Sequence, residues 1–168
     1  MEFDSRATSC NIALHALLVC EVIRTDTEQY ETWFRFGGQF IRFSRYEYAL
    51  VTGLRFGQPT FDPLEHHVPP RGGVYHRHFA GLTVKVDALR ALFTADPFGM
   101  VAADALKLAK ILLFYCLLMG VDGKSYSVEA WVWELVEDEE CWESFPWGAY
   151  TYKNLFHYIC EVPTTLGQ

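Results

Sequence analysis

Histidine is the side chain in this sequence that comes closest to a metal-ligand pattern. His76 and His78 flank Arg77, and their imidazoles would share one face if residues 74–79 formed a strand, with His66 and His67 a short way upstream. No Cys, Asp or Glu stands at ligand spacing in the same segment. The pattern therefore favours a polar, histidine-rich loop over a metal site, and we expect no bound metal.

A run of acids in the second half could in principle supply acid/base chemistry. It consists of Glu137, Asp138, Glu139 and Glu140. Like charges this close need water, so we interpret the run as a solvated helix end. Cys141 follows it, and the neighbouring carboxylates disfavour the thiolate that a nucleophilic cysteine needs. We assign no catalytic residue here.

Nucleotide and hydrolase motifs are missing from the sequence. The glycines never form G-x-G-x-x-G or G-x-x-x-x-G-K-[ST], which are the common phosphate-binding patterns. G-x-S-x-G, H-E-x-x-H and the zinc-deaminase pattern are also missing. We predict that the chain is not an enzyme and that it takes no cofactor and no small-molecule substrate.

Arginines interleaved with aromatic residues are the strongest candidates for contact with a partner. They are Arg35, Arg42, Arg45, Arg55, Arg71 and Arg77. Such a mixture can follow a phosphate backbone and stack on bases. The same guanidinium groups can instead pair with acids of the second half, and the net charge of −7 favours this internal use. Both alternatives stay open.

Charge is distributed unevenly along the chain. Residues 1–90 hold ten acids and ten bases, whereas residues 91–168 hold eleven acids and four bases. Residues 32–90 alone carry eight Lys or Arg against four Asp or Glu. A basic segment within an acidic protein indicates a partner of opposite charge, either DNA at residues 32–90 or a protein at the acidic second half.

The elements that position these residues begin with a hairpin and a helix. Residues 31–43 contain two short alternating runs around Gly37 and Gly38, which can supply the positive φ of a primed hairpin turn. Ser44 and Glu47 have the spacing of a capping box, and Gly53 follows as a stop signal, so a helix is expected within residues 44–53.

The rest of the chain is predicted to be mainly helical. Apolar periodicity favours a first helix over residues 9–23. Residues 58–82 are rich in Pro and Gly and are expected to be loop-rich, with a strand or ordered loop at 74–79. Four helices are expected in residues 83–161, at 84–94, 102–119, 127–136 and 150–160. The predicted fold is one α+β domain over residues 1–168, with five or six helices and a small antiparallel hairpin or sheet.

Composition favours an intracellular protein. The chain is 51% hydrophobic and 21% charged, which is enough to build one core. Its five cysteines form no CxxC pair, so reduced thiols in the nucleus or cytoplasm are expected, with Cys116 and Cys160 packed in the core. The first residues lack a basic signal-peptide region, and no apolar run reaches the roughly 20 residues of a membrane span. We therefore expect no export and no membrane partner.

Residues 33–57, WFRFGGQFIRFSRYEYALVTGLRFG, resemble a plant-specific domain of unknown function. Its hallmark is W-F-x-x-G-G-x-x-x-R-F-S-x-x-E-[FY]-A-L-V-T-G-L-x-x-G, and the likeness continues through KLAKILLFYCLLMGVDG and ELVEDEECWESFPWGAY. Tyr48 stands where Phe is usual, which is a mild departure.

The resemblance implies a domain often found N-terminal to a Ulp-type SUMO-protease domain in transposon-derived plant proteins. The protease residues have no counterpart here, so peptidase activity does not carry over. Some relatives are thought to act on chromatin, which adds weight to a DNA partner and to the nucleus. We predict first a non-enzymatic protein-interaction module and, as the alternative, a DNA- or chromatin-associated domain. The aromatic residues of residues 33–57 are expected to be mostly core.

Overall fold

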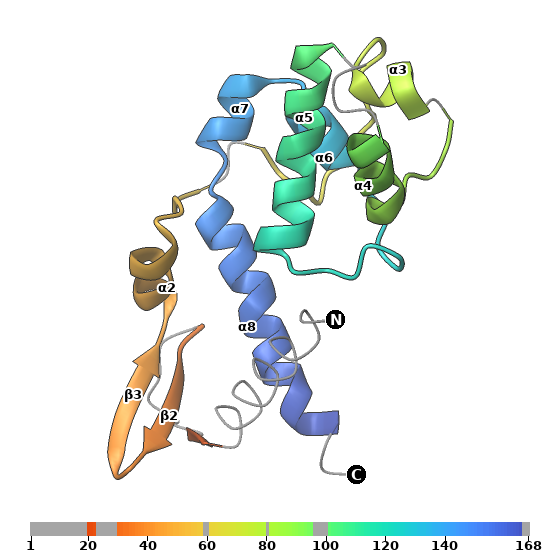
Figure 1. The fold of residues 1–168 in the computed structure, drawn as a ribbon. Helices are drawn as coiled ribbons and strands as arrows, with labels where there is room; N and C mark the ends of the chain where they lie inside the picture. The colour runs from red at the N-terminus through yellow and green to blue at the C-terminus, as the bar shows by residue number, and fades with distance from the viewer. Residues whose placement is uncertain (1–19, 23–29, 59–60, 80, 96–100, 166–168) are drawn as a thin grey trace. The chain divides into compact units, whose positions relative to one another are not determined.

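The computed structural model describes residues 20–22, 30–58, 61–79, 81–95 and 101–165, with side chains up to residue 159. Contacts divide the chain into two compact units: Met1–Gly57 with Pro146–Gln168, and Gln58–Phe145. Within the described residues there are seven α-helices, one π-helical turn and a three-stranded antiparallel sheet (Figure 1). The predicted α+β class is confirmed.

The sheet of the first unit is built around the predicted hairpin. Its strands are β1 (Glu21–Val22), β2 (Thr32–Phe36) and β3 (Gln39–Phe43), in the order β1-β2-β3. Gly37 and Gly38 have φ values of 54° and 83°, so both adopt the left-handed conformation that a two-residue primed turn requires. The turn sets the register, in which Phe36 pairs with Gln39.

The helix predicted over residues 9–23 falls mostly outside the described residues. Where the chain is described, the prediction is wrong, because Glu21–Val22 is a strand. The backbone N–H of Arg35 donates to the Cys20 carbonyl at 2.8 Å, and the Thr32 hydroxyl donates to the Glu21 carboxylate at 2.8 Å. Pairing with β2 therefore outweighs the local helical periodicity.

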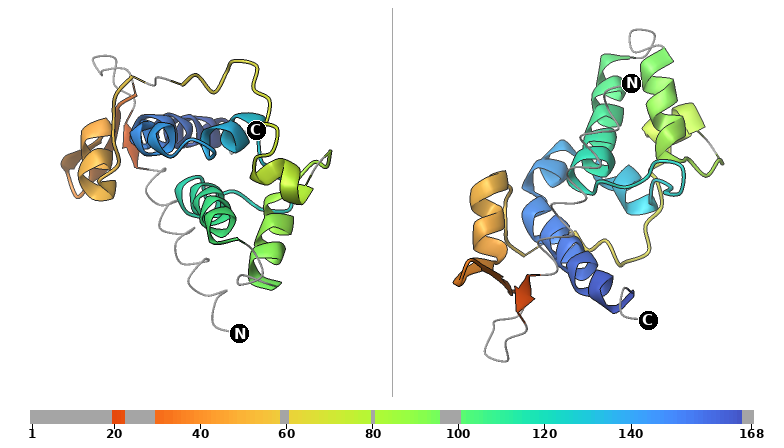
Figure 2. Two further views of the ribbon diagram at one scale, coloured as in Figure 1. Left: turned by 90° about the horizontal axis from the view of Figure 1, so that it is seen from above. Right: turned by 60° about the horizontal axis from the view of Figure 1, so that its bottom comes forward.

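Two helices complete the first unit, α2 (Arg45–Thr52) and α8 (Trp147–Thr165). They lie side by side in both views of Figure 2. Tyr152 on α8 lies at the centre of an aromatic cluster, with its ring 5.3 Å from Tyr48 and 5.9 Å from Phe43. Its hydroxyl donates to the Tyr30 carbonyl at 2.7 Å. The aromatic residues that face α8 thus form the core that was expected.

The second unit is helical. It contains α3 (Val74–Phe79), α4 (Val86–Ala95), α5 (Ala102–Leu113), the π-helical turn η1 (Phe114–Leu118), α6 (Ala130–Leu135) and α7 (Glu139–Ser144). Helices α4 and α5 contact each other. Trp131 is central to the core, with its ring stacked on Phe145 and edge-on to Phe114, both at 5.7 Å.

Residues 74–79 form the helix α3, so the expectation of a strand or ordered loop is wrong. Val74 is fully buried, and its N–H donates to the Glu137 carboxylate, which satisfies one of the free donors at the helix start. Tyr75 and Phe79, four residues apart, both lie against Trp133, at 5.4 and 5.6 Å. The pairing partners of this helix are distant in sequence, which is why local periodicity missed it.

Helices α4 and α8 confirm two predicted segments within a few residues, and α6 covers the second half of another. The predicted helix 102–119 is α5 followed by η1, in which the Met119 N–H donates to the Phe114 carbonyl. The acidic run lies at a helix end, as expected, and its last three residues are exposed. The helix is an additional one, α7, and Asp138 caps its start. No described helix is long and apolar enough to cross a membrane.

Candidate interaction surface

One face of the hairpin alternates arginine and aromatic side chains across β2 and β3. The register pairs Trp33 with Arg42 and Arg35 with Phe40, so these four side chains share a face. The Arg35 guanidinium lies over the Phe40 ring, 5.9 Å from its centroid. A cation held over an aromatic face is stabilised at a partly exposed site, and it presents its remaining donors to a partner.

The hairpin is joined to α2 by the predicted capping box. Ser44 and Glu47 exchange both hydrogen bonds of the box, and Gly53 ends the helix in the left-handed conformation with φ 67°. The Ser44 hydroxyl, with help from Arg42, lowers the pKa of Glu47 to about 2. Arg42 donates to Glu47 at 3.0 Å and lies 3.9 Å from Glu31. The Arg42 charge therefore stabilises the connection between β3 and α2.

Helix α2 turns apolar side chains toward solvent. Tyr48 holds the inner face, because its hydroxyl donates to Thr151 at 3.1 Å. On the outside, Leu50 and Val51 are 85% and 84% exposed. Arg45 lies over the ring of its exposed neighbour Tyr46, 5.2 Å from the centroid. No residue of α2 is fully buried.

We call the exposed side chains of β3 and α2 the hairpin–helix surface. They are Phe40, Ile41, Tyr46, Leu50 and Val51, and each is more than half exposed. Scattered exposed apolar residues are normal, but five of them within twelve consecutive positions are an informative concentration. The expectation that the aromatic residues of residues 33–57 are mostly core is therefore wrong for Phe40 and Tyr46.

The structure divides the six candidate arginines between the units. Arg35, Arg42, Arg45 and Arg55 belong to the first unit, whereas Arg71 and Arg77 belong to the second. The Arg55 carbonyl accepts from the Gly148 N–H at 2.8 Å, which fixes its backbone against α8. The described contacts of Arg35 and Arg45 are with aromatic rings. Among the four arginines of the first unit, these two are the best placed to contact a partner, while Arg71 is exposed in the second unit.

Arg77 has a structural role in the second unit. Its guanidinium donates to both oxygens of Asp104, and His78 Nε2 lies 2.9 Å from the same carboxylate. Arg77 first, and then His78, lower the pKa of Asp104 to about 2 although burial opposes this. His76 Nδ1 meets the Pro70 carbonyl at 3.0 Å instead. The helix thus gives the two histidines separate partners, and among the described residues no group of three metal-ligating side chains occurs.

Residues 21–158 match the family profile described as "Domain of unknown function (DUF1985)", which is well over half of the chain. The chain belongs to the DUF1985 family. The match extends from β1 into α8 and includes the whole hairpin–helix surface. Searches of curated proteins and of solved structures gave no match.

Three acids of the DUF1985 chain between residues 134 and 143 form ion pairs with lysine or histidine. Lys107 Nζ lies 2.5 Å from Glu137, and Lys110 Nζ lies 3.4 Å from Glu139. Glu134 meets His67 Nδ1 at 3.0 Å. These three pairs lie within the second unit.

The cysteines of the DUF1985 chain differ in their surroundings. A hydrogen bond with Asp138, together with burial, raises the pKa of Cys141, which confirms that its thiolate is disfavoured. Cys116 was expected in the core, but it is exposed, and Arg90 Nη2 lies 3.1 Å from its sulfur. Cys116 lies in the π-helical turn, whose wider spacing rotates the residues after α5.

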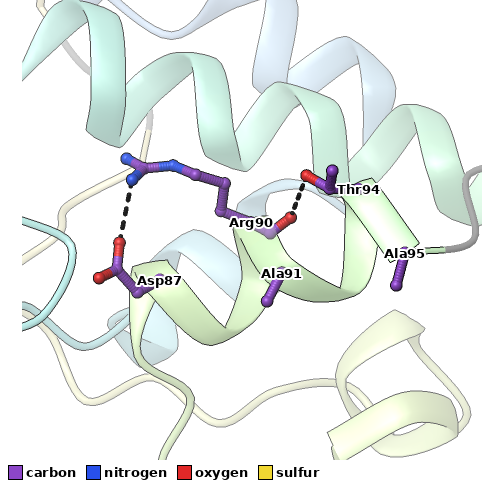
Figure 3. A pocket seen from close by; sticks show the side chains of 5 residues that line it. All are labelled: Asp87, Arg90, Ala91, Thr94 and Ala95. Carbon is purple, nitrogen blue, oxygen red and sulfur yellow. Dashed lines mark hydrogen bonds and ion pairs between the residues drawn. The ribbon is translucent and has the colours of Figure 1, made fainter. Parts of the chain in front are cut away.

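An open hollow of about 530 Å³ lies along α4 in the second unit (Figure 3). Its lining residues are Asp87, Arg90, Ala91, Thr94 and Ala95. Arg90 donates to Asp87 at 3.0 Å, and the Thr94 hydroxyl donates to the Arg90 carbonyl at 2.8 Å. The polar groups of the hollow thus bond to each other, and the described lining offers no acid/base pair.

The residues of the hairpin–helix surface were not singled out by sequence reasoning. A usable signal was present, because Tyr46, Tyr48, Ala49, Leu50 and Val51 spread apolar side chains around most of a short helix. A helix that packs on one side only cannot bury all of them.

Proposed function

We propose that this DUF1985 chain is a non-enzymatic protein-interaction module that binds its partner through the hairpin–helix surface. The observation that carries the proposal is the exposure of Leu50, Val51 and Tyr46 on the capped helix α2, together with that of Phe40 and Ile41 on β3. Interface centres are enriched in aromatic residues and arginine. This surface contains Phe40 and Tyr46, and Arg35 and Arg45 lie over their rings.

The kind of protein and the cell compartment in which the module acts are part of the same proposal. The residue pattern of residues 33–57 resembles plant proteins in which the domain precedes a Ulp-type protease, and it supports an accessory module in transposon-derived plant proteins. An intracellular site of action, with the nucleus favoured, is consistent with free cysteines at positions 20, 116 and 141. The perturbed carboxylates Glu47 and Asp104 serve a helix cap and an ion pair, which supports a role without catalysis.

The test is capture from plant nuclear extract with the full chain as bait. We expect Leu50→Glu/Val51→Glu to lose the captured protein, because two charges would have to be buried at the interface. Leu64→Glu is the matched control, since Leu64 is 89% exposed and belongs to the second unit. Nuclease treatment should leave the captured protein in place. Equal capture by all three baits would contradict the proposal.

Nucleic-acid binding is the second candidate. It is supported by Arg35 and Arg45, whose guanidinium groups lie over aromatic rings in a segment with few acids. The measurement is fluorescence anisotropy with mixed single- and double-stranded DNA and RNA at low salt. Binding that falls with salt and is lost in Arg35→Glu/Arg45→Glu would support this candidate. No complex at low salt would count against it.

A further inference from the structure

Strand β3 is the open edge of the sheet. The order β1-β2-β3 leaves one side of β3 without a partner strand among the described residues, and β3 is the outer strand of the hairpin in Figure 1. Its first three residues, Gln39, Phe40 and Ile41, are all exposed. Natural sheets usually cover or charge such an edge, because it can pair with another chain.

The turn determines which backbone groups point to this edge. In a two-residue hairpin the closing pair, here Phe36 and Gln39, is hydrogen-bonded, and bonded and non-bonded pairs then alternate. Arg35 and Phe40 therefore form a non-bonded pair. The N–H and C=O of Phe40 point away from β2, toward the open edge.

Charge at this edge is positive. Strands β2 and β3 carry Arg35 and Arg42 and no acid. Arg42 is engaged with Glu31 and Glu47, so the charge considered at the edge is that of Arg35. Glu47 is engaged with Ser44 and Arg42. The Arg35 side chain crosses from β2 to lie over Phe40, so its charge is located above β3, next to the open edge.

We infer that β3 accepts an extended acidic segment of a partner protein as an additional strand of the sheet. This inference rests on the proposed function and names its partner class. Strand addition at an exposed edge gives affinity through main-chain hydrogen bonds and specificity through alternate side chains. The Phe40 backbone supplies the hydrogen bonds, and Arg35 selects the charge.

The sheet geometry also gives the side-chain pattern of the partner. A residue opposite Phe40 has its side chain on the face of Phe40 and Arg35, where a carboxylate meets the guanidinium. Its two neighbours point to the other face, beside the exposed Ile41, where apolar side chains fit. Acidic and apolar residues should therefore alternate in the bound segment.

A second copy of this chain fits the edge less well. Pairing two β3 strands would bring two hairpins of the same positive charge together, and like charges at close range on paired strands are destabilising. An acidic strand would instead be attracted to the positive charge at this edge. Self-association through β3 is therefore an outcome that would contradict the inference.

The first experiment uses the full chain and labelled synthetic peptides whose centre alternates Glu and Val. We expect this peptide to bind more weakly as salt rises. A peptide with Pro replacing the central Glu lacks the donor N–H, and a peptide with Lys replacing Glu has the opposite charge. The Pro peptide should bind about tenfold more weakly, because it loses a main-chain hydrogen bond as well as the carboxylate. The Lys peptide should bind about fivefold more weakly, because only its charge changes.

Two variants of the chain test the same contacts from the other side. Phe40→Pro removes the edge N–H, which edge strands tolerate, and it should bind up to about tenfold more weakly than Phe40→Ala, which keeps that N–H. Arg35→Glu should bind the Glu peptide about fivefold more weakly and the Lys peptide more tightly than the unmodified chain does. Circular dichroism and thermal unfolding report whether each variant is folded, and the peptide comparison does not depend on them.

Three outcomes would each overturn the inference. They are equal binding of the Glu and Pro peptides, a dimer that is lost in Phe40→Pro, and displacement of the Glu peptide by an oligonucleotide. The proposed function would stand if a captured protein still depended on Leu50 and Val51 but not on Phe40 or Arg35. If capture depended neither on Leu50 and Val51 nor on Phe40 and Arg35, both proposals would be contradicted.

Discussion

Glu47 and Asp104 are carboxylates that their neighbours hold in the charged form, with pKa values of about 2. Glu47 joins β3 to α2 in the first unit, and Asp104 joins α3 to α5 in the second. Their pKa values lie below the ordinary ones of 4.5 and 3.8, so each stabilises its unit above its ordinary pKa. That stabilisation is lost as the pH falls toward about 2.

For Glu47 we expect Glu47→Ala to lower the free energy of unfolding at neutral pH by about 1 kcal/mol, because it removes half of a capping box. Urea unfolding between pH 5 and 2 should show a smaller loss of stability with acid in this variant than in the unmodified chain. Glu65→Ala, which changes an exposed loop acid, is the control and should keep the full acid sensitivity. An unchanged acid profile in Glu47→Ala would contradict the assignment.

For Asp104 the expected result is coupling with Arg77. Asp104→Asn leaves a partly buried guanidinium without its carboxylate, so its cost should exceed that of a surface change and reach about 2 kcal/mol. In the double variant with Arg77→Met, the two losses should be less than additive by about 1 kcal/mol or more. A double-mutant cycle by urea unfolding measures this. Additive losses would show that the pair does not stabilise the unit.

At the scale of elements, His67 holds the loop before α3 against α6. Its Nδ1 meets the Glu134 carboxylate at 3.0 Å and its Nε2 meets the Asp62 carbonyl at 2.7 Å, while its ring stacks on Phe61 at 4.5 Å. Two acceptors for two ring nitrogens favour the imidazolium. Burial works against the charged form, but Asp62, Glu134 and the more distant Glu65 outweigh it and raise the pKa of His67.

The stability that a raised pKa provides is complete below the ordinary value of 6.5 and is lost as the pH rises through the higher folded value. We therefore expect hydrogen exchange of residues 61–67 to increase at alkaline pH beyond its intrinsic rise. His67→Gln should show the faster exchange at all pH values. If the unmodified loop keeps constant protection across this range, the histidine does not hold it.

Gly148 lets α8 approach the segment after α2. A Cβ at this position would lie 2.5 Å from the Phe56 ring and 2.7 Å from the Arg55 carbonyl. Gly148→Ala should therefore destabilise the first unit by about 1–3 kcal/mol, as overpacking does. Gly57→Ala is the matched control, because a Cβ there meets nothing within 4 Å. Thermal unfolding that ranks the two variants equally would contradict this packing.

Elements with a local signal were predictable from the sequence. The Gly37–Gly38 turn, the Ser44/Glu47 box and the Gly53 stop each depend on residues close in the chain, and each is confirmed. The strand at Glu21 and the helix α3 were missed, because their hydrogen bonds come from Thr32 and Glu137. Exposure of Leu50 and Val51 was missed for the same reason, since it depends on which side of α2 packs on α8.

At the scale of the whole molecule, the charged side chains of the two units have different roles. The second unit contains most of the acids and uses several of them internally, with Lys107, Lys110, His67 and Arg77 as partners. The first unit carries arginines on aromatic rings and the exposed apolar residues of β3 and α2. An apolar hairpin–helix surface with Arg35 and Arg45 beside it, on a protein of net charge −7, is the basis of the proposed partner contact.

Photo-crosslinking from single positions shows whether the hairpin–helix surface contacts a protein partner. A benzophenone side chain at Val51 or at Leu64 gives two full-length probes, each exposed and each in a different unit. We expect the Val51 probe to form a discrete protein crosslink in plant nuclei that survives nuclease. The Leu64 probe should not form this crosslink. A crosslink to nucleic acid alone from Val51, or the same protein from both probes, would contradict the claim.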